Sequence, residues 1–470
     1  MHEGQGPGAT AMTLGTILER FLQEAPVAVM YRALLERVFD PAELDALFER
    51  NAKDQYTRDV LFSAVVDLMA AVVFGVKPSV RAAYLRPMGE IAASLTAVYE
   101  KLKGVEPGVC RALVGDTSAH LRRIVDRLDA RLPVPVAGYR VKVVDGNHLT
   151  GTDHRVPATR TTRAAALPGQ ALVVLDLATM LVVDVVPCED AHTQERALVD
   201  DLKPGVAAGD LWIADRNFCT TRMLFLLRSE GARFLIRQHK SRLIWAESSE
   251  WADAGRTDTG AVAEQSIAVR ESEDAAPIAV RRIRLTLDRA TRSEDREIFL
   301  LSDVPAEDAP AARLADAYRK RWRLENVFQT LTEALRCEID TLAYPRAALL
   351  GFCTALVAYN LLATVRAALR SAHGAEAVES KVSNYYLAEE IASTHQGLRI
   401  AVEESEWSAF GRMPEREFAE FLTEAASQAQ LRRYPKSARG PKKPPPRRDS
   451  GKTNHHVSTA RLIDQQKRRK

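Results

Sequence analysis

The chain has 470 residues, of which 46% are hydrophobic and 27% are charged, so it is a folded protein with room for two or three domains and not a disordered or fibrous chain. The first residues lack the basic and then apolar pattern of a secretion signal. The long apolar run Ala347–Ala363 contains Tyr359 and Asn360, which predicts a buried helix and no membrane span. Five scattered cysteines without a C-x-x-C pair predict a reducing, cytoplasmic compartment and neither a disulfide framework nor a structural zinc site.

Charge is distributed unevenly along the chain. From Lys436 to Lys470 there are 12 Lys or Arg and 2 Asp, which gives this tail a charge of about +10. The remaining 53 basic and 60 acidic residues leave the rest of the chain near −7. A basic tail on an acidic body predicts binding to a polyanion. A tail that only increases solubility is the alternative.

Residues 1–133 are predicted to form a helical region, with binding to DNA ends as its candidate role. Apolar residues recur there every three or four positions in Thr13–Gln23, Val27–Val38, Pro41–Asn51, Arg58–Phe74, Ser79–Leu85, Ile91–Gly104 and Thr117–Leu132. Arg58–Phe74 and Ser79–Leu85, joined by Gly75–Pro78, are compatible with a helix-turn-helix DNA-binding motif. A corner of an ordinary helical bundle has the same pattern and is the alternative.

An α/β pattern follows the helical region. Tyr139–Val144 is a predicted strand that ends at Asp145, and Leu211–Ala214 is a predicted strand that ends at Asp215. Between and after them lie the predicted strands Ala171–Leu175, Met180–Val186 and Arg233–Gln238 and the predicted helices His192–Leu202 and Cys219–Glu230. This order predicts a mixed sheet flanked by helices.

An insertion interrupts the predicted core. Residues 239–295 are polar with alternating stretches such as Ile278–Leu287, which predicts an antiparallel β-rich unit. The predicted organisation is therefore a helical region (1–133), an α/β core (134–238 and 296–370), the insertion (239–295), a second helical region (371–435) and a basic disordered tail (436–470).

Ala317–Cys337 is predicted to be one continuous helix, because it has no Pro or Gly and is rich in helix formers. One face of it is apolar and consists of Ala317, Leu324, Phe328, Leu331 and Leu335. The adjacent face carries Tyr318, Arg321, Trp322, Glu325, Gln329 and Thr332. A structural ion pair between Arg321 and Glu325, four residues apart, is one interpretation. A functional face is the other, because such a set of side chains is unusual beside a buried stripe.

Three carboxylates are candidate metal ligands. Asp145 and Asp215 are predicted at the carboxyl ends of strands, where open α/β sheets bind ligands. If the two strands are neighbours, the carboxylates converge and repel each other unless they share a cation, which predicts a hard divalent metal. Glu325 would add a third oxygen ligand, and three carboxylates around Mg²⁺ suit two-metal phosphoryl transfer. A structural role for each residue alone is the alternative.

Three sequence motifs carry a resemblance to a known family. Val144-Asp145-Gly146 and Ile213-Ala214-Asp215-Arg216 resemble its two Asp motifs, and residues 318–325 (YRKRWRLE) fit its Y-x-x-R-x-x-x-E signature. The segment 139–370 thus resembles a bacterial insertion-sequence transposase of the "IS four" family, which has an RNase H-like core with a DDE triad. One departure is Thr332, which stands where the signature has a Lys. Either Arg336 or Lys320 makes that phosphate contact instead, or binding to the transposon end is weaker.

The resemblance implies a role for each matched residue. Asp145, Asp215 and Glu325 would be catalytic and would hold two Mg²⁺ ions, for which Mn²⁺ would substitute. The residues expected to contact DNA are Tyr318, Arg321, Trp322, Arg216, Asn147 and His148. Packing of Trp322 against the sheet is an alternative to stacking on a base. His148 is expected to form hydrogen bonds to the metal ligands, and direct binding of the metal by His148 is the alternative.

The resemblance also implies a reaction and its partners. A homodimer assembled on DNA in the bacterial nucleoid would bind the terminal inverted repeats and the target DNA. It would hydrolyse the 3′ end of the element, form and open a hairpin, and transfer the strand. A nuclease that cuts without joining and a non-enzymatic DNA-binding protein derived from a transposase are the alternatives. The three carboxylates argue against the second alternative, and Thr332 argues for it.

Overall fold

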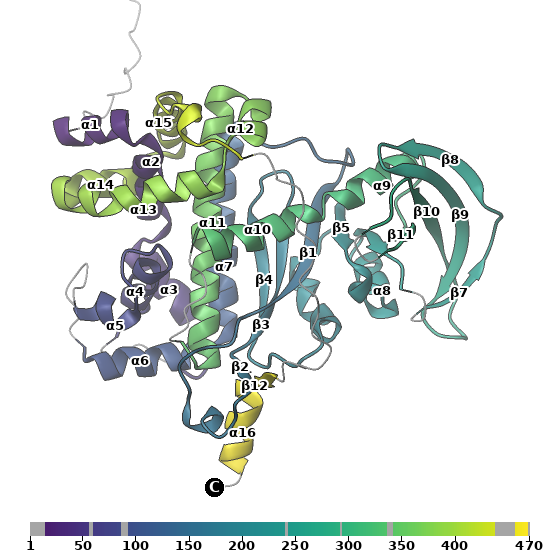
Figure 1. Ribbon diagram of the computed structural model, residues 1–470, viewed down its shortest axis with the longest axis horizontal. Coiled ribbons are helices and arrows are strands. Elements are labelled where there is room, and N and C mark those ends of the chain that lie inside the picture. Colours follow the sequence, from purple (N-terminus) through teal and green to yellow (C-terminus); the bar gives the residue numbers. More distant parts are fainter. Residues whose placement is uncertain are drawn as a thin grey trace, which may run out of the picture.

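The protein joins a layer of helices to one large mixed sheet (Figure 1). The computed structural model describes residues 15–55, 60–85, 93–239, 243–291, 294–335, 342–437 and 456–468. The strands of the large sheet are β1 (Arg140–His148), β3 (Gln170–Asp176), β4 (Val182–Cys188), β5 (Asp210–Ala214), β6 (Arg233–Arg237), β7 (Ile244–Glu247), β8 (Ala252–Thr257), β9 (Gly260–Arg270), β10 (Ile278–Leu287) and β11 (Glu297–Ser302). The predicted mixed α/β fold is confirmed.

The sheet is parallel only at its centre. Its strand order is β4-β3-β1-β5-β6-β11-β10-β9-β7, and β8 pairs with β9. β5 pairs in parallel with β1 and β6, and the other pairs are antiparallel. Every residue of β3 and β5 is buried, which agrees with their continuous apolar sequence and with helices on both faces.

The predicted insertion extends the same sheet. Strands β7, β8, β9 and β10 lie within residues 239–295, and β10 pairs with β11 of the core. These strands are antiparallel to one another, as their alternating sequence predicts. In Figure 1 they form the curved end of the sheet, with α9 (Ala311–Arg319) packed against β8 and β9.

The helices on the other side come from both ends of the chain. The N-terminal ones are α1 (Thr16–Glu24), α2 (Pro26–Val38), α3 (Pro41–Asn51), α4 (Phe62–Val73), α5 (Val80–Leu85), α6 (Leu95–Gly104) and α7 (Pro107–Arg127). The C-terminal ones are α11 (Pro345–His373), α12 (Ala375–Lys381), α13 (Asn384–Ala401), α14 (Glu404–Arg412) and α15 (Glu415–Ser427). α2 packs against α13, α14 and α15, so the two predicted helical regions form one layer.

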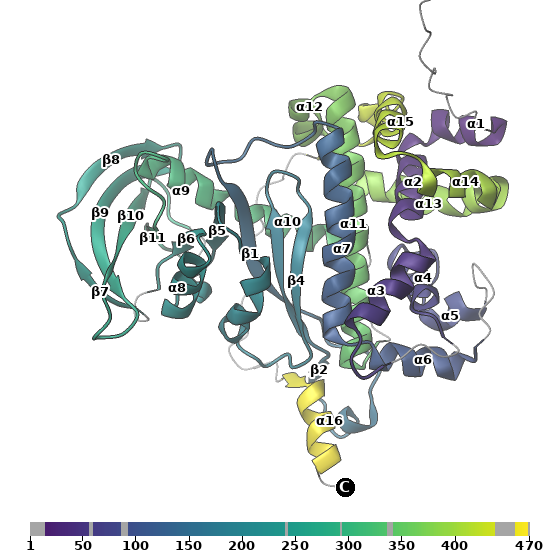
Figure 2. The same ribbon diagram turned by 180° about the vertical axis from the view of Figure 1, so that it is seen from behind.

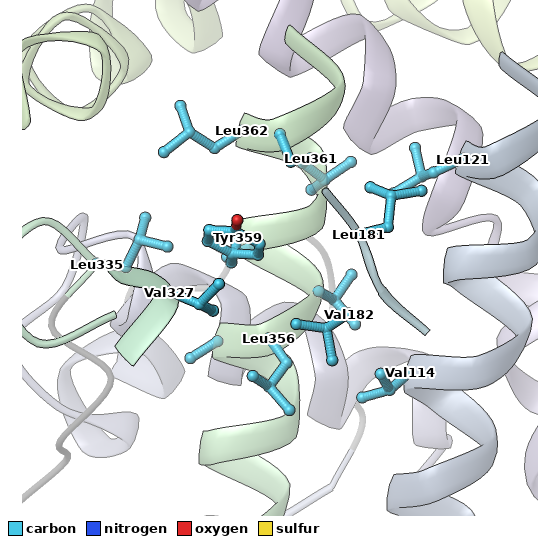
Figure 3. Packing of buried hydrophobic residues seen from close by; sticks show 14 of the residues in the cluster. Val114, Leu121, Leu181, Val182, Val327, Leu335, Leu356, Tyr359, Leu361 and Leu362 are labelled. Atoms are coloured by element: carbon cyan, nitrogen blue, oxygen red, sulfur yellow. The ribbon is translucent and has the colours of Figure 1, made fainter. Parts of the chain in front are cut away.

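Helix α11 lies at the centre of this layer, beside α7 (Figures 1 and 2). It is long and apolar enough to cross a membrane, but its most apolar window is buried completely, which confirms the predicted core helix. Figure 3 shows Leu356 of α11 beside Val182 of β4, and Leu361 on the side of α11 that faces Leu121 of α7. Asn360 fixes α11 to β4: its Oδ1 accepts a hydrogen bond from the Val182 amide at 2.7 Å, and its Nδ2 donates one to the Val182 carbonyl at 2.8 Å.

The basic tail differs in part from the predicted disordered arm. Residues 456–468 form β12 (His456–Ser458) and α16 (Thr459–Arg468), and β12 pairs in parallel with β2 (Ala165–Leu167). Arg461 also forms an ion pair with Asp190 at 2.7 Å. Composition alone predicted disorder because the tail is rich in Lys, Arg and Pro. The backbone pairing with β2 is a tertiary contact that composition does not show.

Candidate active site between β1, β5 and α10

Asp145 and Asp215 lie side by side at the parallel centre of the sheet. The pairing of β1 with β5 ends at Val144 and Ala214, and each aspartate is the next residue. Asp215 follows the end of β5 as predicted. Asp145, in contrast, is not at a strand end: β1 continues to His148 because its other edge stays paired with β3. Asp145 thus lies where β1 extends beyond β5.

Glu325 lies on the same side of the sheet as Asp145, and Arg321 connects the two. The Arg321 guanidinium donates one hydrogen bond to Asp145 Oδ2 at 2.6 Å and another to Glu325 Oε1 at 2.8 Å. Helix α10 (Trp322–Glu333), which carries Glu325, packs against β1. The predicted ion pair between Arg321 and Glu325 is therefore present, and a carboxylate 176 residues away shares it.

The predicted continuous helix Ala317–Cys337 is instead divided into two helices, with the break at Lys320 and Arg321. α9 ends at Arg319 and α10 begins at Trp322, and the residues after Glu333 are described only to Leu335. At the junction, the backbone amides of Lys320, Arg321, Arg323 and Leu324 each donate a hydrogen bond to the carbonyl three positions earlier. Such 3₁₀-type bonds tighten the turn between the two helices. Residue propensities contain no signal for this turn, because both halves are good helix formers.

The pKa values of Asp145, Tyr318 and Arg321 are all raised in this site. Burial, with the nearby Asp215 and Glu195 carboxylates, raises the pKa of Asp145 from 3.8 to about 6, although Arg321 opposes the rise. Burial also raises the pKa of Tyr318 to about 12, so its hydroxyl remains a hydrogen-bond donor. Burial alone would lower the pKa of the Arg321 guanidinium, but Tyr318 and the surrounding carboxylates raise it overall.

The other residues expected to contact DNA differ in accessibility. The Trp322 side chain is 58% exposed, so it does not pack against the sheet as the alternative required. Arg216 and His148 are exposed, and Asn147 is half-buried. Thr332 is exposed, and its hydroxyl donates to the Phe328 carbonyl at 2.8 Å. Of its predicted substitutes, Arg336 lies outside the described residues.

Sequence reasoning missed two residues at this site. Glu195 opens the 3₁₀ segment η2 (Glu195–Gly205), and its Oε2 accepts a hydrogen bond from Asn217 Nδ2 at 2.5 Å. Asn217 lies in η3 (Arg216–Phe218), and its backbone amide donates a hydrogen bond to Asp215 Oδ1 at 2.7 Å. No local sequence pattern identifies Glu195. In the structure its carboxylate lies against Gly146, where a Cβ would be 2.0 Å from Glu195 Oε1.

The donor chemistry of the site fits a hard divalent cation. Asp145, Asp215 and Glu325 offer carboxylate oxygens, which Mg²⁺ prefers, and the repulsion between the two aspartates would be relieved by a cation. Within the described ranges, however, no three acidic, His or Cys side chains converge in a metal-binding arrangement. The Arg321 guanidinium instead binds two of the three carboxylates, those of Asp145 and Glu325.

Comparison with known proteins points to one enzyme class. Residues 137–361 match the family model for the transposase DDE domain. This segment is just under half of the chain, contains all three carboxylates, and runs from the residues before β1 into α11. The match supports a DDE transposase, a class of enzyme that cleaves DNA, transfers strands and generally uses divalent metals.

Two further comparisons add little. The piggyBac transposase synaptic complex with hairpin DNA, solved by cryo-EM, aligns over 82% of this chain and 84% of its own with 10% identity and a TM-score of 0.36. At that score the similarity supports no argument about this chain. The comparison with curated proteins finds no match.

Proposed function

We propose that the chain is a DNA transposase of the "IS four" type, with Asp145, Asp215 and Glu325 as the catalytic triad of an RNase H-like core. The observation that carries the proposal is the meeting of β1, β5 and α10. Asp145 on β1 and Asp215, which directly follows the adjacent parallel strand β5, lie there beside an Arg-x-x-x-Glu pair. All of these residues fall within the segment that matches the transposase DDE domain.

In this proposal the triad holds two Mg²⁺ ions, or Mn²⁺ in their place, which would polarise the phosphate and activate the attacking oxygen. Arg321 exchanges its carboxylate partners for phosphate oxygens when DNA binds, because a planar guanidinium matches both kinds of anion. The protonated Tyr318 hydroxyl donates a hydrogen bond to a neighbouring phosphate oxygen. The exposed indole of Trp322 stacks on a base.

Three exposed or half-buried residues complete the proposed DNA contacts. Arg216 would bind the phosphate backbone as a cation, and Asn147 and His148 would orient the strand from the end of β1. The proposed partners are the terminal inverted repeats of the element and the target DNA. We propose a homodimer on DNA as the working form, in the cytoplasm beside the nucleoid.

The proposed reaction is a series of phosphoryl transfers at one site. Water first cleaves the phosphodiester at the 3′ end of the element, and the freed 3′-hydroxyl then attacks the opposite strand to give a hairpin. Water opens the hairpin, and the regenerated 3′-hydroxyl attacks target DNA. In each step one P–O bond forms as another breaks, and the leaving oxygen takes up a proton.

The test uses purified full-length protein, Mg²⁺, and a labelled duplex that carries the inverted repeats flanking its gene. Wild-type protein should yield both cleaved and joined products. Asp215→Ala and Glu325→Ala should lose both products but still shift the duplex on a gel, while the exposed control Asp274→Asn should behave as wild type. Full activity of either alanine variant would reject the triad. Cleavage without joining would indicate the nuclease, and binding without cleavage the DNA-binding protein.

A further inference from the structure

Glu195 reaches the candidate site from the layer opposite to α10. Successive residues of a strand point to opposite faces, and β1 packs accordingly. Val143 belongs to the cluster that contains Leu324 of α10, whereas Val144 belongs to the cluster that contains Leu198 and Val199 of η2. Glu195 opens η2, so its carboxylate approaches β1 from the second of these faces.

A gap in the side-chain packing of β1 admits the Glu195 carboxylate. Gly146 follows Asp145 on the strand, and a Cβ there would lie 2.0 Å from Glu195 Oε1 and 2.3 Å from the carboxyl carbon. The backbone of β1 is extended at this point, so conformational freedom is not the reason for the glycine. The position instead requires the absence of a side chain.

The same carboxylate is connected to the second aspartate. Glu195 Oε2 accepts a hydrogen bond from the Asn217 side chain (Nδ2) at 2.5 Å. The backbone amide of Asn217 donates to Asp215 Oδ1 at 2.7 Å. Glu195 thus touches the residue after Asp145 and holds the residue that binds Asp215. Segments η2 and η3 are in contact, so the connection is part of the packing.

We propose that Glu195 is a positioning residue of the active site, which fixes Asn217 and thereby the Asp215 carboxylate next to Asp145. This inference rests on the proposed function, because it assigns Glu195 to the same metal-dependent centre. Glu195 acts on Asp215 through its hydrogen bond with Asn217. This hydrogen bond needs an oxygen acceptor at position 195 but not a negative charge. Residues that orient metal ligands typically contribute about 10- to 100-fold to metal affinity or activity.

The experiment compares Glu195→Gln, Glu195→Ala and Asn217→Ala in the full-length protein. Mn²⁺ binding without DNA is measured by electron paramagnetic resonance, and cleavage of the labelled duplex is measured as kcat and KM. Glu195→Gln keeps an oxygen acceptor for Asn217 and should stay within a few-fold of wild type. Glu195→Ala and Asn217→Ala should each lose about 10- to 100-fold in Mn²⁺ affinity and in kcat, with KM for DNA little changed.

A double-mutant cycle tests whether the effect of Glu195 arises from its contact with Gly146. Gly146→Ala displaces the intact Glu195 carboxylate and should reproduce Glu195→Ala, and the double variant should be no worse than either single one because both remove the same contact. Gln194→Ala, an exposed neighbour, is the matched control, and thermal melting verifies the fold of every variant.

Two results would overturn the role of Glu195. Wild-type Mn²⁺ affinity in Glu195→Ala would show that the residue positions nothing. A loss in Glu195→Gln as large as in Glu195→Ala would show that the charge itself is required. Failure of the proposed function gives a different pattern: Mn²⁺ binding would be unaffected even by Asp145→Asn, or wild-type protein would not cleave the duplex.

Discussion

The raised pKa of Asp145 makes a quantitative prediction about stability. A carboxyl group whose pKa rises from 3.8 to about 6 on folding binds its proton more tightly in the folded than in the unfolded protein. The stabilisation from this proton is complete below the unfolded pKa and is lost as the pH rises through 6. The rise corresponds to about 3 kcal/mol of unfolding free energy. The Asp145 side chain is 18% exposed, so solvent screens this cost only weakly.

Asp145→Asn removes this titration while it preserves the size of the side chain. As the pH rises from 4 to 8, wild type should lose up to about 3 kcal/mol more of its free energy of unfolding than the variant does. This free energy is measured by urea denaturation in EDTA. Asp274→Asn, at an exposed position, should leave the wild-type pH dependence unchanged. Equal pH dependence of wild type and Asp145→Asn would refute the conclusion that an ionised Asp145 strains the fold.

Three more predictions follow from other contacts. Arg321→Ala should increase the Mn²⁺ affinity of the DNA-free protein in calorimetry, because the guanidinium no longer bonds Asp145 and Glu325; weaker binding would contradict this. Asn360→Leu should lower the free energy of unfolding in urea by about 1–3 kcal/mol, because it leaves the buried amide and carbonyl of Val182 without partners. An unchanged midpoint would mean that the hydrogen bonds between Asn360 and Val182 do not stabilise the fold. Deletion of residues 436–470 should weaken DNA binding and flatten its dependence on salt, and the same slope in both proteins would exclude phosphate contacts by the tail.

The candidate site was predictable in so far as its signals are local. The apolar stretches before Asp145 and Asp215 identified two strands, and the four-residue spacing of Arg321 and Glu325 identified one of the two ion pairs. The partner of Arg321 at Asp145 lies 176 residues away, and nothing in the local pattern distinguished Glu195 from the other 61 acidic residues. Which carboxylates meet depends on the strand order and on the turn between α9 and α10.

The sequence by itself determined the kinds of elements and their order, because hydrophobic periodicity and turn residues act over a few positions. It also determined that Ala347–Ala363 is a core helix, since Asn360 in an apolar run needs a buried partner. Only the tertiary structure decided that helices from the two ends of the chain pack into one layer, that the insertion extends the core sheet, and that residues 456–458 pair with β2. These arrangements depend on contacts between distant segments, whose energies arise from complementary packing and backbone pairing and leave no periodic signal in either segment alone.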